Sequence, residues 1–266
     1  MMIKAIAVDM DGTFLDTTSR YDVQRFERIY HQLCKKQIKF IVASGNQYYQ
    51  LKSFFPGKDA EIVYVAENGA IIGENQNLQS VSQFSSTFVQ TLLSVLLTND
   101  YTLEFIVCGV KSAYLLSSAS QQFKEFAKKY YYQLTEVSSF NTLPDDVFVK
   151  IALDVEVEKT NSVVKQLNVQ FDGQLVAVAS GHGSIDIIIP DITKGSTIAK
   201  LLKKWQIMPD ELLAFGDANN DLEMLGLTKH SYAMEQSSPQ VKRTATYQAP
   251  SNNNSGVLAV IETYLD

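Results

Sequence analysis

Hydrophobic residues at the start of the chain follow the pattern of a parallel sheet. Residues 3–9 (IKAIAVD) form a short apolar run rich in β-branched side chains, which predicts a strand buried on both faces. Residues 22–36 carry apolar side chains at helical spacing, and residues 39–44 and 61–67 are two further apolar runs. A strand, a helix and a strand in this order predict right-handed crossovers between parallel strands.

The pattern changes between residues 82 and 184. An amphipathic helix comes first. The later helical and strand-like runs are LEFIVCG, AYLLSS, QQFKEFAKKYY, VFVKIALD and LVAVAS. Helices that alternate with hairpin strands predict an α+β module with an antiparallel sheet.

After residues 185–190 (IDIIIP) the first pattern returns, with a helix at STIAKLLKKW, a strand at residues 211–217 and a closing helix. The sequence therefore predicts an α/β core made of residues 1–81 and 185–266. An α+β domain at residues 82–184 is predicted to be inserted into this core.

Composition and charge limit the classes of function. The chain has 266 residues, of which 45% are hydrophobic and 20% are charged, as in a globular protein with a packed core. A formal net charge of −6 provides no field that attracts polyanions, which argues against nucleic acid or an anionic membrane as the main partner. A small phosphorylated substrate needs only a local cluster of donors. The oligomeric state is not indicated.

The sequence carries no sign of export or membrane insertion. Its longest apolar runs fall short of the roughly 20 residues that a bilayer span requires, and IKAIAV is too short for a signal peptide. Cys34 and Cys108 lie far apart and form no CxxC pair, so we expect each to be a small buried hydrophobic residue in a reducing compartment. We expect a cytoplasmic protein.

Aspartates follow two of the predicted parallel strands, Asp9 and Asp11 after the first and Asp217 at the end of residues 211–217. Ligands bind outside the carboxyl ends of such strands, so we expect these carboxylates to meet there. Packed together without compensation, they would repel one another and take up protons. Mg²⁺, with its preference for oxygen ligands, resolves this repulsion.

Aspartates in these patterns also occur in turns, helix caps and Ca²⁺ loops. A single DxD pair is also typical of a turn or a helix cap. The Ca²⁺ loop signature requires glycine at its sixth position, where DANND is followed by Leu222, so this signature is not met.

Three further segments are candidates for binding phosphate. Ser44-Gly45-Asn46 follows a predicted strand, where backbone N–H groups can approach a phosphate, although SGN is also an ordinary turn. Lys194 precedes a helix and offers a positive charge, or is simply solvated. His182, in the inserted domain, either faces the active site or is a polar turn residue.

Four motifs in order resemble the haloacid dehalogenase superfamily of phosphohydrolases. They are DMDGT (9–13), ASGN (43–46), TKGS (193–196) and GDANND (216–221). Their order and spacing resemble the Cof-type subfamily, in which a type IIB cap domain falls between the second and third motifs. Through VDMDGTFL, VASGNQYYQL and VAENGA the chain is similar to the bacterial sugar phosphatases of this subfamily. The resemblance implies a Rossmann-like core with an inserted α+β cap.

The resemblance also implies roles for individual residues. Asp9 would attack phosphorus and form an aspartyl phosphate, and Asp11 would act as the general acid and base. Mg²⁺ would be held by Asp9, the Asp11 carbonyl and Asp217, with Asp221 in support and Thr13 bonded to nearby backbone. The residues around the phosphoryl oxygens would be Ser44, Gly45, Asn46, Lys194 and Asn220. Many members of the subfamily carry TGR where this chain, like the sugar phosphatases that it resembles, has SGN, so the resemblance does not carry over a role for arginine in orienting the substrate.

The function expected on this basis is a Mg²⁺-dependent phosphatase of small phosphorylated metabolites, chiefly sugar phosphates. A phosphosugar mutase and a phosphatase of flavin or nucleotide monophosphates stay open as alternatives. A receiver-like signalling module is roughly half this length, and a P-type pump requires membrane helices. The insertion would select the leaving group and exclude water.

Overall fold

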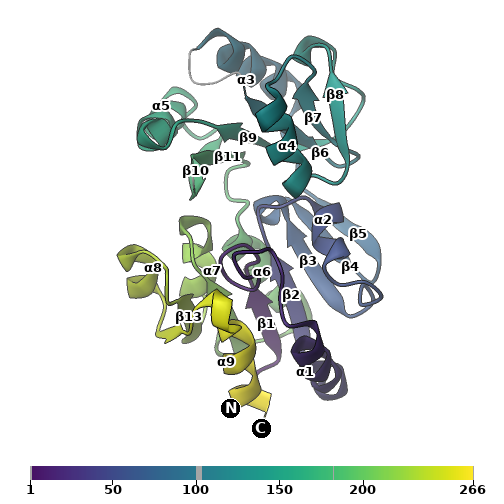
Figure 1. Cartoon of the computed structure of the whole chain (residues 1–266), viewed down its shortest axis with the longest axis vertical. Helices are drawn as coiled ribbons and strands as arrows, with labels where there is room; N and C mark the ends of the chain where they lie inside the picture. The colour runs from purple at the N-terminus through teal and green to yellow at the C-terminus, as the bar shows by residue number, and fades with distance from the viewer. Residues whose placement is uncertain (1, 100–103, 182, 266) are drawn as a thin grey trace.

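The computed structural model describes residues 2–99, 104–181 and 183–265, which form two sheets with helices packed on them (Figure 1). The strands of the larger sheet are β1 (Ala5–Val8), β2 (Lys39–Ala43), β3 (Ile62–Ala66), β4 (Ile71–Glu74), β5 (Asn77–Val81), β12 (Leu212–Gly216), β13 (His230–Met234) and β14 (Tyr247–Ala249). Their order is β14-β13-β12-β1-β2-β3-β4-β5. Strand β1 is central and pairs in parallel with β2 and β12.

The large sheet is parallel from β14 to β3, as predicted, and ends in an antiparallel edge that the sequence analysis did not predict. Strands β4 and β5 are joined by Asn75 and Gln76, both with positive φ (52° and 66°). Two left-handed residues make a tight hairpin whose twist matches the strands. The usual glycine signal is absent there, so the hairpin was missed.

Helices cover both faces of this sheet. They are α1 (Val23–Lys36), α2 (Tyr48–Ser53), α6 (Lys194–Trp205), α7 (Leu222–Gly226), α8 (Pro239–Thr244) and α9 (Gly256–Leu265). Along β1, Ile6 and Val8 belong to the apolar cluster that includes α1 and α9, whereas Ala5 and Ala7 belong to the cluster that includes α6. Successive side chains of a strand point to opposite faces, which explains the unbroken apolar run.

The smaller sheet belongs to the inserted domain. Its strands are β6 (Phe105–Gly109), β7 (Ala113–Leu116), β8 (Leu134–Val137), β9 (Phe148–Asp154), β10 (Val176–Gly181) and β11 (Ser184–Ile188), in the order β10-β11-β9-β6-β7-β8. Its helices are α3 (Ser86–Thr98), α4 (Gln121–Tyr130) and α5 (Thr160–Gln170). All of its pairs are antiparallel except β7 with β8, which confirms the predicted α+β insertion with a largely antiparallel sheet.

Short 3₁₀ segments complete the described elements. They are η1 (Glu67–Gly69), η2 (Phe140–Thr142), η3 (Val157–Lys159), η4 (Pro209–Glu211), η5 (Asn219–Asp221) and η6 (Asn252–Asn254). Two of them, η1 and η5, lie close to the carboxyl ends of β3 and β12 and contribute to the site described below.

Strand β11 bears on where the inserted domain ends. Residues 185–188 were predicted to begin the return to the core, yet β11 pairs with β9 and β10 of the smaller sheet. The run IDII is apolar enough to fit either sheet, so its pattern alone does not decide. We propose a boundary after residue 188, with residues 82–85 and 189–193 as the two connections.

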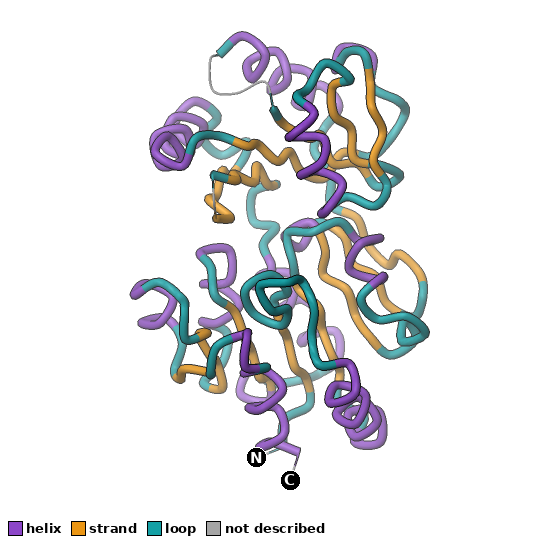
Figure 2. The backbone as a smooth tube through the Cα atoms, in the orientation of Figure 1, coloured by secondary structure: helices purple, strands orange, loops and turns teal. Residues whose placement is uncertain are grey.

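The two sheets face each other across loops (Figure 2). The loop after β1 and the second connection lie between them, while the chain termini lie together at the opposite end of the core. The carboxyl ends of the parallel strands therefore point toward the inserted domain, as expected for a ligand site in an open α/β sheet.

Two expectations about the surface have separate outcomes. Cys108 is buried in β6 as predicted, whereas Cys34 is exposed, because α1 turns Phe26, Ile29 and Leu33 inward instead. Among the described residues, no helix combines the length and the apolar character that crossing a membrane requires.

Candidate active site

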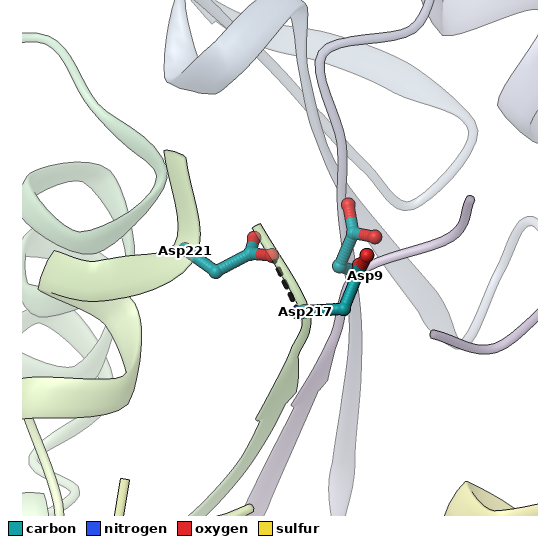
Figure 3. Close-up of side chains that lie close together, drawn as sticks. All are labelled: Asp9, Asp217 and Asp221. Atoms are coloured by element: carbon teal, nitrogen blue, oxygen red, sulfur yellow. Dashed lines mark hydrogen bonds between the residues drawn. The ribbon is translucent and has the colours of Figure 1, made fainter. Parts of the chain in front are cut away.

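Three carboxylates from two distant parts of the chain meet at the carboxyl end of the large sheet. Asp9 follows β1 and Asp217 follows β12, and Val8 and Phe215 of these two strands are paired. Asp221 approaches from η5, and one oxygen from each of the three carboxylates lies within 4.8 Å of the others (Figure 3). Parallel pairing of β1 with β12 is therefore what brings the two motifs together.

Lys194 is part of this cluster and is fully buried. As the first residue of α6, it places its Nζ 2.5 Å from Asp9 Oδ1 and 2.7 Å from Asp221 Oδ1. Burial alone would lower the pKa of Lys194, but the Asp221 and Asp9 carboxylates outweigh it and raise this pKa above the usual lysine value. The alternative of a solvated surface lysine is therefore wrong.

Asp221 has the most hydrogen bonds of the three carboxylates. Its Oδ2 accepts the backbone N–H groups of Asp217 (3.0 Å) and Ala218 (3.1 Å), and its Oδ1 accepts Lys194. These bonds fold the loop after β12 back on itself, so that Asp217 points toward Asp9. Asp221 thus holds the loop that carries Asp217 in place.

The cluster carries an excess of negative charge. Burial, followed by the neighbouring Asp221 charge, raises the pKa of Asp217 to about 6. Burial also raises the pKa of Asp9, even though Lys194 opposes this effect. Three carboxylates against one ammonium group favour a divalent cation, and carboxylate oxygens at this spacing fit Mg²⁺.

Gly12 and Thr13 shape the position of Asp217. Gly12 has a φ of +79°, which favours glycine, and a Cβ atom there would lie 2.5 Å from Asp217 Oδ2, so a side chain at this position would displace the Asp217 carboxylate. The Thr13 hydroxyl donates to Asp217 Oδ1 at 2.8 Å. The sequence analysis expected Thr13 to bond nearby backbone. That expectation is wrong for its side chain, since the chain bends enough to bring a distant carboxylate into reach.

The predicted phosphate loop lies beside Asp11. Ser44 is buried and its Oγ accepts the Asn46 N–H at 3.1 Å, which closes a tight turn around Gly45. Asn46 donates its side-chain amide to Asp11 Oδ2 at 2.5 Å. Loss of solvation raises the pKa of Asp11, although the hydrogen bond from Asn46 opposes the rise. The structure thus places Asn46 where it orients Asp11.

Two other predicted residues have different outcomes. Asn220, on η5, donates its side-chain amide to Asn68 Oδ1 at 3.1 Å and borders the same cleft. His182 lies outside the described residues.

A cleft of about 470 Å³ separates the cluster from the inserted domain, a size suited to a small metabolite. The core side is formed by Asp9, Asp11, Ser44, Gly45, Asn46, Asp217 and Asn220. The inserted domain contributes, among others, Ile106, Phe123, Phe126, Tyr130, Tyr131, Lys150, Asp154, Ser180, Ser184 and Asp186.

Part of the inserted domain's side of the cleft is aromatic. Phe126 and Tyr130 are half-buried on α4, with ring centroids 5.1 Å apart, and Phe123 lies one turn earlier. We name Phe123, Phe126 and Tyr130 the aromatic wall. The sequence analysis did not select these residues, because the run QQFKEFAKKYY shows helical spacing but not what the helix faces.

Comparisons with known proteins agree with this architecture. A family model described as haloacid dehalogenase-like hydrolase matches residues 6–261. An Escherichia coli protein named 5-amino-6-(5-phospho-D-ribitylamino)uracil phosphatase YbjI is 42% identical over 266 residues, covering 100% of this chain and 97% of its own. A Bacillus subtilis protein, YwtE, named for the same activity, is 23% identical and covers 99% and 98%.

A solved structure extends the similarity to three dimensions. SMU.1108c from Streptococcus mutans UA159 is similar with a TM-score of 0.94 and 38% sequence identity, covering 99% of each chain. Fold and sequence therefore match over the whole length, inserted domain included.

Proposed function

Because this chain belongs to the haloacid dehalogenase-like hydrolases, as a Cof-type phosphatase, we propose that its substrate is 5-amino-6-(5-phospho-D-ribitylamino)uracil or a close analogue. The observation that carries the proposal is the cleft, which places the aromatic rings of Phe126 and Tyr130 in the same cavity as the carboxylates of Asp9, Asp11 and Asp217. The relative's substrate, as its name states, joins a phosphate to a planar ring through a polyol chain.

This proposal replaces the expected preference for sugar phosphates. A simple sugar phosphate has no planar ring to stack on Phe126 or Tyr130, so it would lack the aromatic pair that a planar heterocycle could form there. The alternative of flavin or nucleotide monophosphates is supported better, since these also carry a flat nitrogen heterocycle.

We propose Asp9 as the nucleophile and Asp11 as the general acid and base. An Asp9 carboxylate oxygen would form a bond to phosphorus as the bond from phosphorus to the substrate oxygen breaks. Asp11 would give its proton to the departing oxygen and later take one from the water that hydrolyses the aspartyl phosphate. The raised pKa of Asp11 supports the first of these tasks, because the carboxyl must arrive protonated.

The remaining core residues position and balance charge. Lys194 holds Asp9 Oδ1 and keeps that carboxylate oriented, and Asn46 does the same for Asp11. Mg²⁺, when bound, would be held by Asp9, Asp217 and the main-chain carbonyl of Asp11, and would supply positive charge to the phosphoryl oxygens. Ser44 and the Gly45 and Asn46 amides would receive the other oxygens.

Phosphate release from a panel of compounds tests the proposal. The panel compares 5-amino-6-(5-phospho-D-ribitylamino)uracil, flavin mononucleotide, ribose 5-phosphate and glucose 6-phosphate, each with Mg²⁺ and with EDTA. We expect a kcat/KM at least about tenfold higher for the ring-bearing compounds, and no turnover in EDTA. Faster release from the sugar phosphates would overturn the ring preference, and formation of an isomer faster than free phosphate would make the protein a mutase.

A further inference from the structure

The turn after β3 has an unusual backbone. Glu67, Asn68 and Gly69 all have positive φ, at 51°, 56° and 106°. Non-glycine residues adopt this region rarely, and they keep it only where their surroundings require it. Both side chains are also buried, at 1% exposure each, although glutamate and asparagine are seldom found inside a protein. The burial and the backbone strain together indicate that the Glu67 and Asn68 side chains make specific contacts inside the protein.

Both side chains reach into the inserted domain. Glu67 Oε2 lies 2.8 Å from Nζ of Lys150 on β9, and the Asn68 amide donates to Asp186 Oδ2 on β11 at 2.7 Å. Lys150 also lies 3.7 Å from Asp186 Oδ1 and donates to the Gly45 carbonyl. We name Glu67, Asn68, Lys150 and Asp186 the junction.

The turn is tied to the core loops by bonds of its own. The Asn68 N–H donates to the Ser44 carbonyl at 3.0 Å, and the Glu67 N–H donates to the Asn46 carbonyl at 3.2 Å. Asn68 Oδ1 accepts Asn220, at the edge of the acidic cluster. The core therefore holds the phosphate loop by bonds that do not involve Lys150, and Lys150 adds one bond from the inserted domain, to the Gly45 carbonyl.

The charges of the junction favour one position of the inserted domain relative to the core. Lys150 is 2% exposed, and its closest carboxylate, Glu67, comes from the other domain. A buried ammonium group is stable only where its partners are correctly placed, so a shifted inserted domain would leave charges unpaired. Gln47 and Gln50 add neutral hydrogen bonds to the main chain at Gln133 and Lys129, near the end of α4.

We propose that the junction sets the orientation of the inserted domain, and so holds the aromatic wall at a fixed distance from Asp9 and Asp11. Lys150 is then a positioning residue for the leaving group of the substrate. The inference rests on the proposed function, since it assumes a leaving group long enough to reach the aromatic wall. The segment VAENGA, which is part of the family resemblance but has no assigned role, contains Glu67 and Asn68. The inference assigns this segment the role of orienting the inserted domain.

Steady-state kinetics with two substrates tests the inference. Lys150→Met removes the ammonium group and keeps an unbranched side chain of similar length. For 5-amino-6-(5-phospho-D-ribitylamino)uracil we expect kcat/KM to fall about 30-fold, mainly through KM. For acetyl phosphate, too short to reach the aromatic wall, we expect a change within about threefold. Lys150→Arg should recover part of the loss. An equal fall on both substrates, or no fall on either, would overturn the inference.

A matched control and a second pair of variants keep the test decisive. Lys124→Met removes a lysine whose partner, Glu136 at 2.8 Å, lies within the inserted domain, and it should change neither substrate's kcat/KM. Should Lys150→Met fail to fold, Glu67→Gln and Asp186→Asn keep the shape of the site and should reproduce the selective loss. The double variant Lys150→Met/Glu67→Gln should lose no more than the worse single variant, because the two residues act together.

A measurement without substrate separates the junction from the proposed function. Hydrogen exchange in the connections, residues 82–85 and 189–193, should be faster in Lys150→Met than in wild type and unchanged in Lys124→Met. If wild type releases phosphate from neither compound, the proposed function fails, and hydrogen exchange still decides on the junction. Unchanged exchange in Lys150→Met would overturn the junction even in an active phosphatase.

Discussion

The carboxylate cluster of the core and the aromatic wall of the inserted domain are built by different means. In the cluster, charged groups are held by several directed bonds, as when Asp221 accepts three donors and Lys194 contacts two carboxylates. On the inserted side, Phe126 and Tyr130 present half-exposed rings on a single helix. Bond-breaking needs charges at fixed positions, whereas choosing a leaving group needs an apolar surface of the right shape. Each side should therefore respond differently to substitution.

Removing the proposed nucleophile, Asp9, should have the largest effect. We expect Asp9→Asn to lower kcat at least about 10³-fold for every substrate, because an amide cannot attack phosphorus, while the fold is kept. Phosphate release and the thermal midpoint measure the two quantities. Asp145→Asn, at an exposed position of the inserted domain, is the control. Substantial turnover by Asp9→Asn would remove Asp9 as nucleophile.

Removing the buried cation of the core side should come next. Lys194→Met leaves Asp9, Asp217 and Asp221 without their ammonium partner, so we expect the free energy of unfolding in EDTA to fall by about 3–5 kcal/mol. Added Mg²⁺ should restore more stability to this variant than to wild type. Urea denaturation with and without Mg²⁺ measures both effects.

The matched control for this prediction lies on the same helix. Lys204→Met removes an ion pair with Glu74 from a lysine side chain that is 57% exposed, and it should cost less than about 1 kcal/mol. Equal losses from the two lysines would mean that the carboxylate cluster does not depend on its buried cation.

Two glycines with the same backbone strain separate geometry from stability. Gly12 and Gly57 have φ values of +79° and +75°, so alanine at either position should cost about 1 kcal/mol of stability. A Cβ atom at Gly12 would collide with Asp217 Oδ2, whereas the described surroundings of Gly57 leave it room. Gly12→Ala alone should weaken Mg²⁺ binding, by at least about tenfold in titration calorimetry. Equal Mg²⁺ affinity in both variants would contradict the placement of Asp217 at the cation.

Truncating the aromatic wall should have the smallest but most selective effect. We expect Phe126→Ala to lower kcat/KM about tenfold for 5-amino-6-(5-phospho-D-ribitylamino)uracil, which corresponds to the loss of about one aromatic contact. For acetyl phosphate, kcat/KM should stay nearly unchanged. For the first of these substrates, Phe126→Leu should have a kcat/KM between those of wild type and Phe126→Ala. A uniform loss on both substrates would show that this ring supports the fold rather than the choice of substrate.

The sequence predicted the core side well and the inserted side poorly, for a physical reason. Asp9 and Asp217 stand at the ends of two strands, and parallel pairing brings the ends of adjacent strands together. Short sequence patterns were therefore enough to predict the family, the core fold and the contact between these two carboxylates. The position of Lys150 is different. In FVKIALD it looks like an ordinary outward residue of a strand, and its partner Glu67 lies in another domain.

The same limit explains the other misses. The position of the aromatic wall depends on how α4 is oriented over the core. Which of the two sheets β11 joins depends on the strands that it meets in the folded chain, here β9 and β10. The spacing of apolar residues within one segment predicts neither of these two arrangements. The Asn75-Gln76 hairpin was missed because its left-handed residues are not glycines.

The central position of β1 has a consequence for synthesis on the ribosome. Ala5 of this strand pairs with Lys39 on one side and with Leu212 on the other. The first partner emerges early, but the second follows only after the whole inserted domain has been translated. Until then, a fully apolar strand keeps one edge bare, and such edges recruit other chains. We expect the nascent protein to depend on a chaperone during this interval and to complete its sheet last, when β12 slides in beside β1.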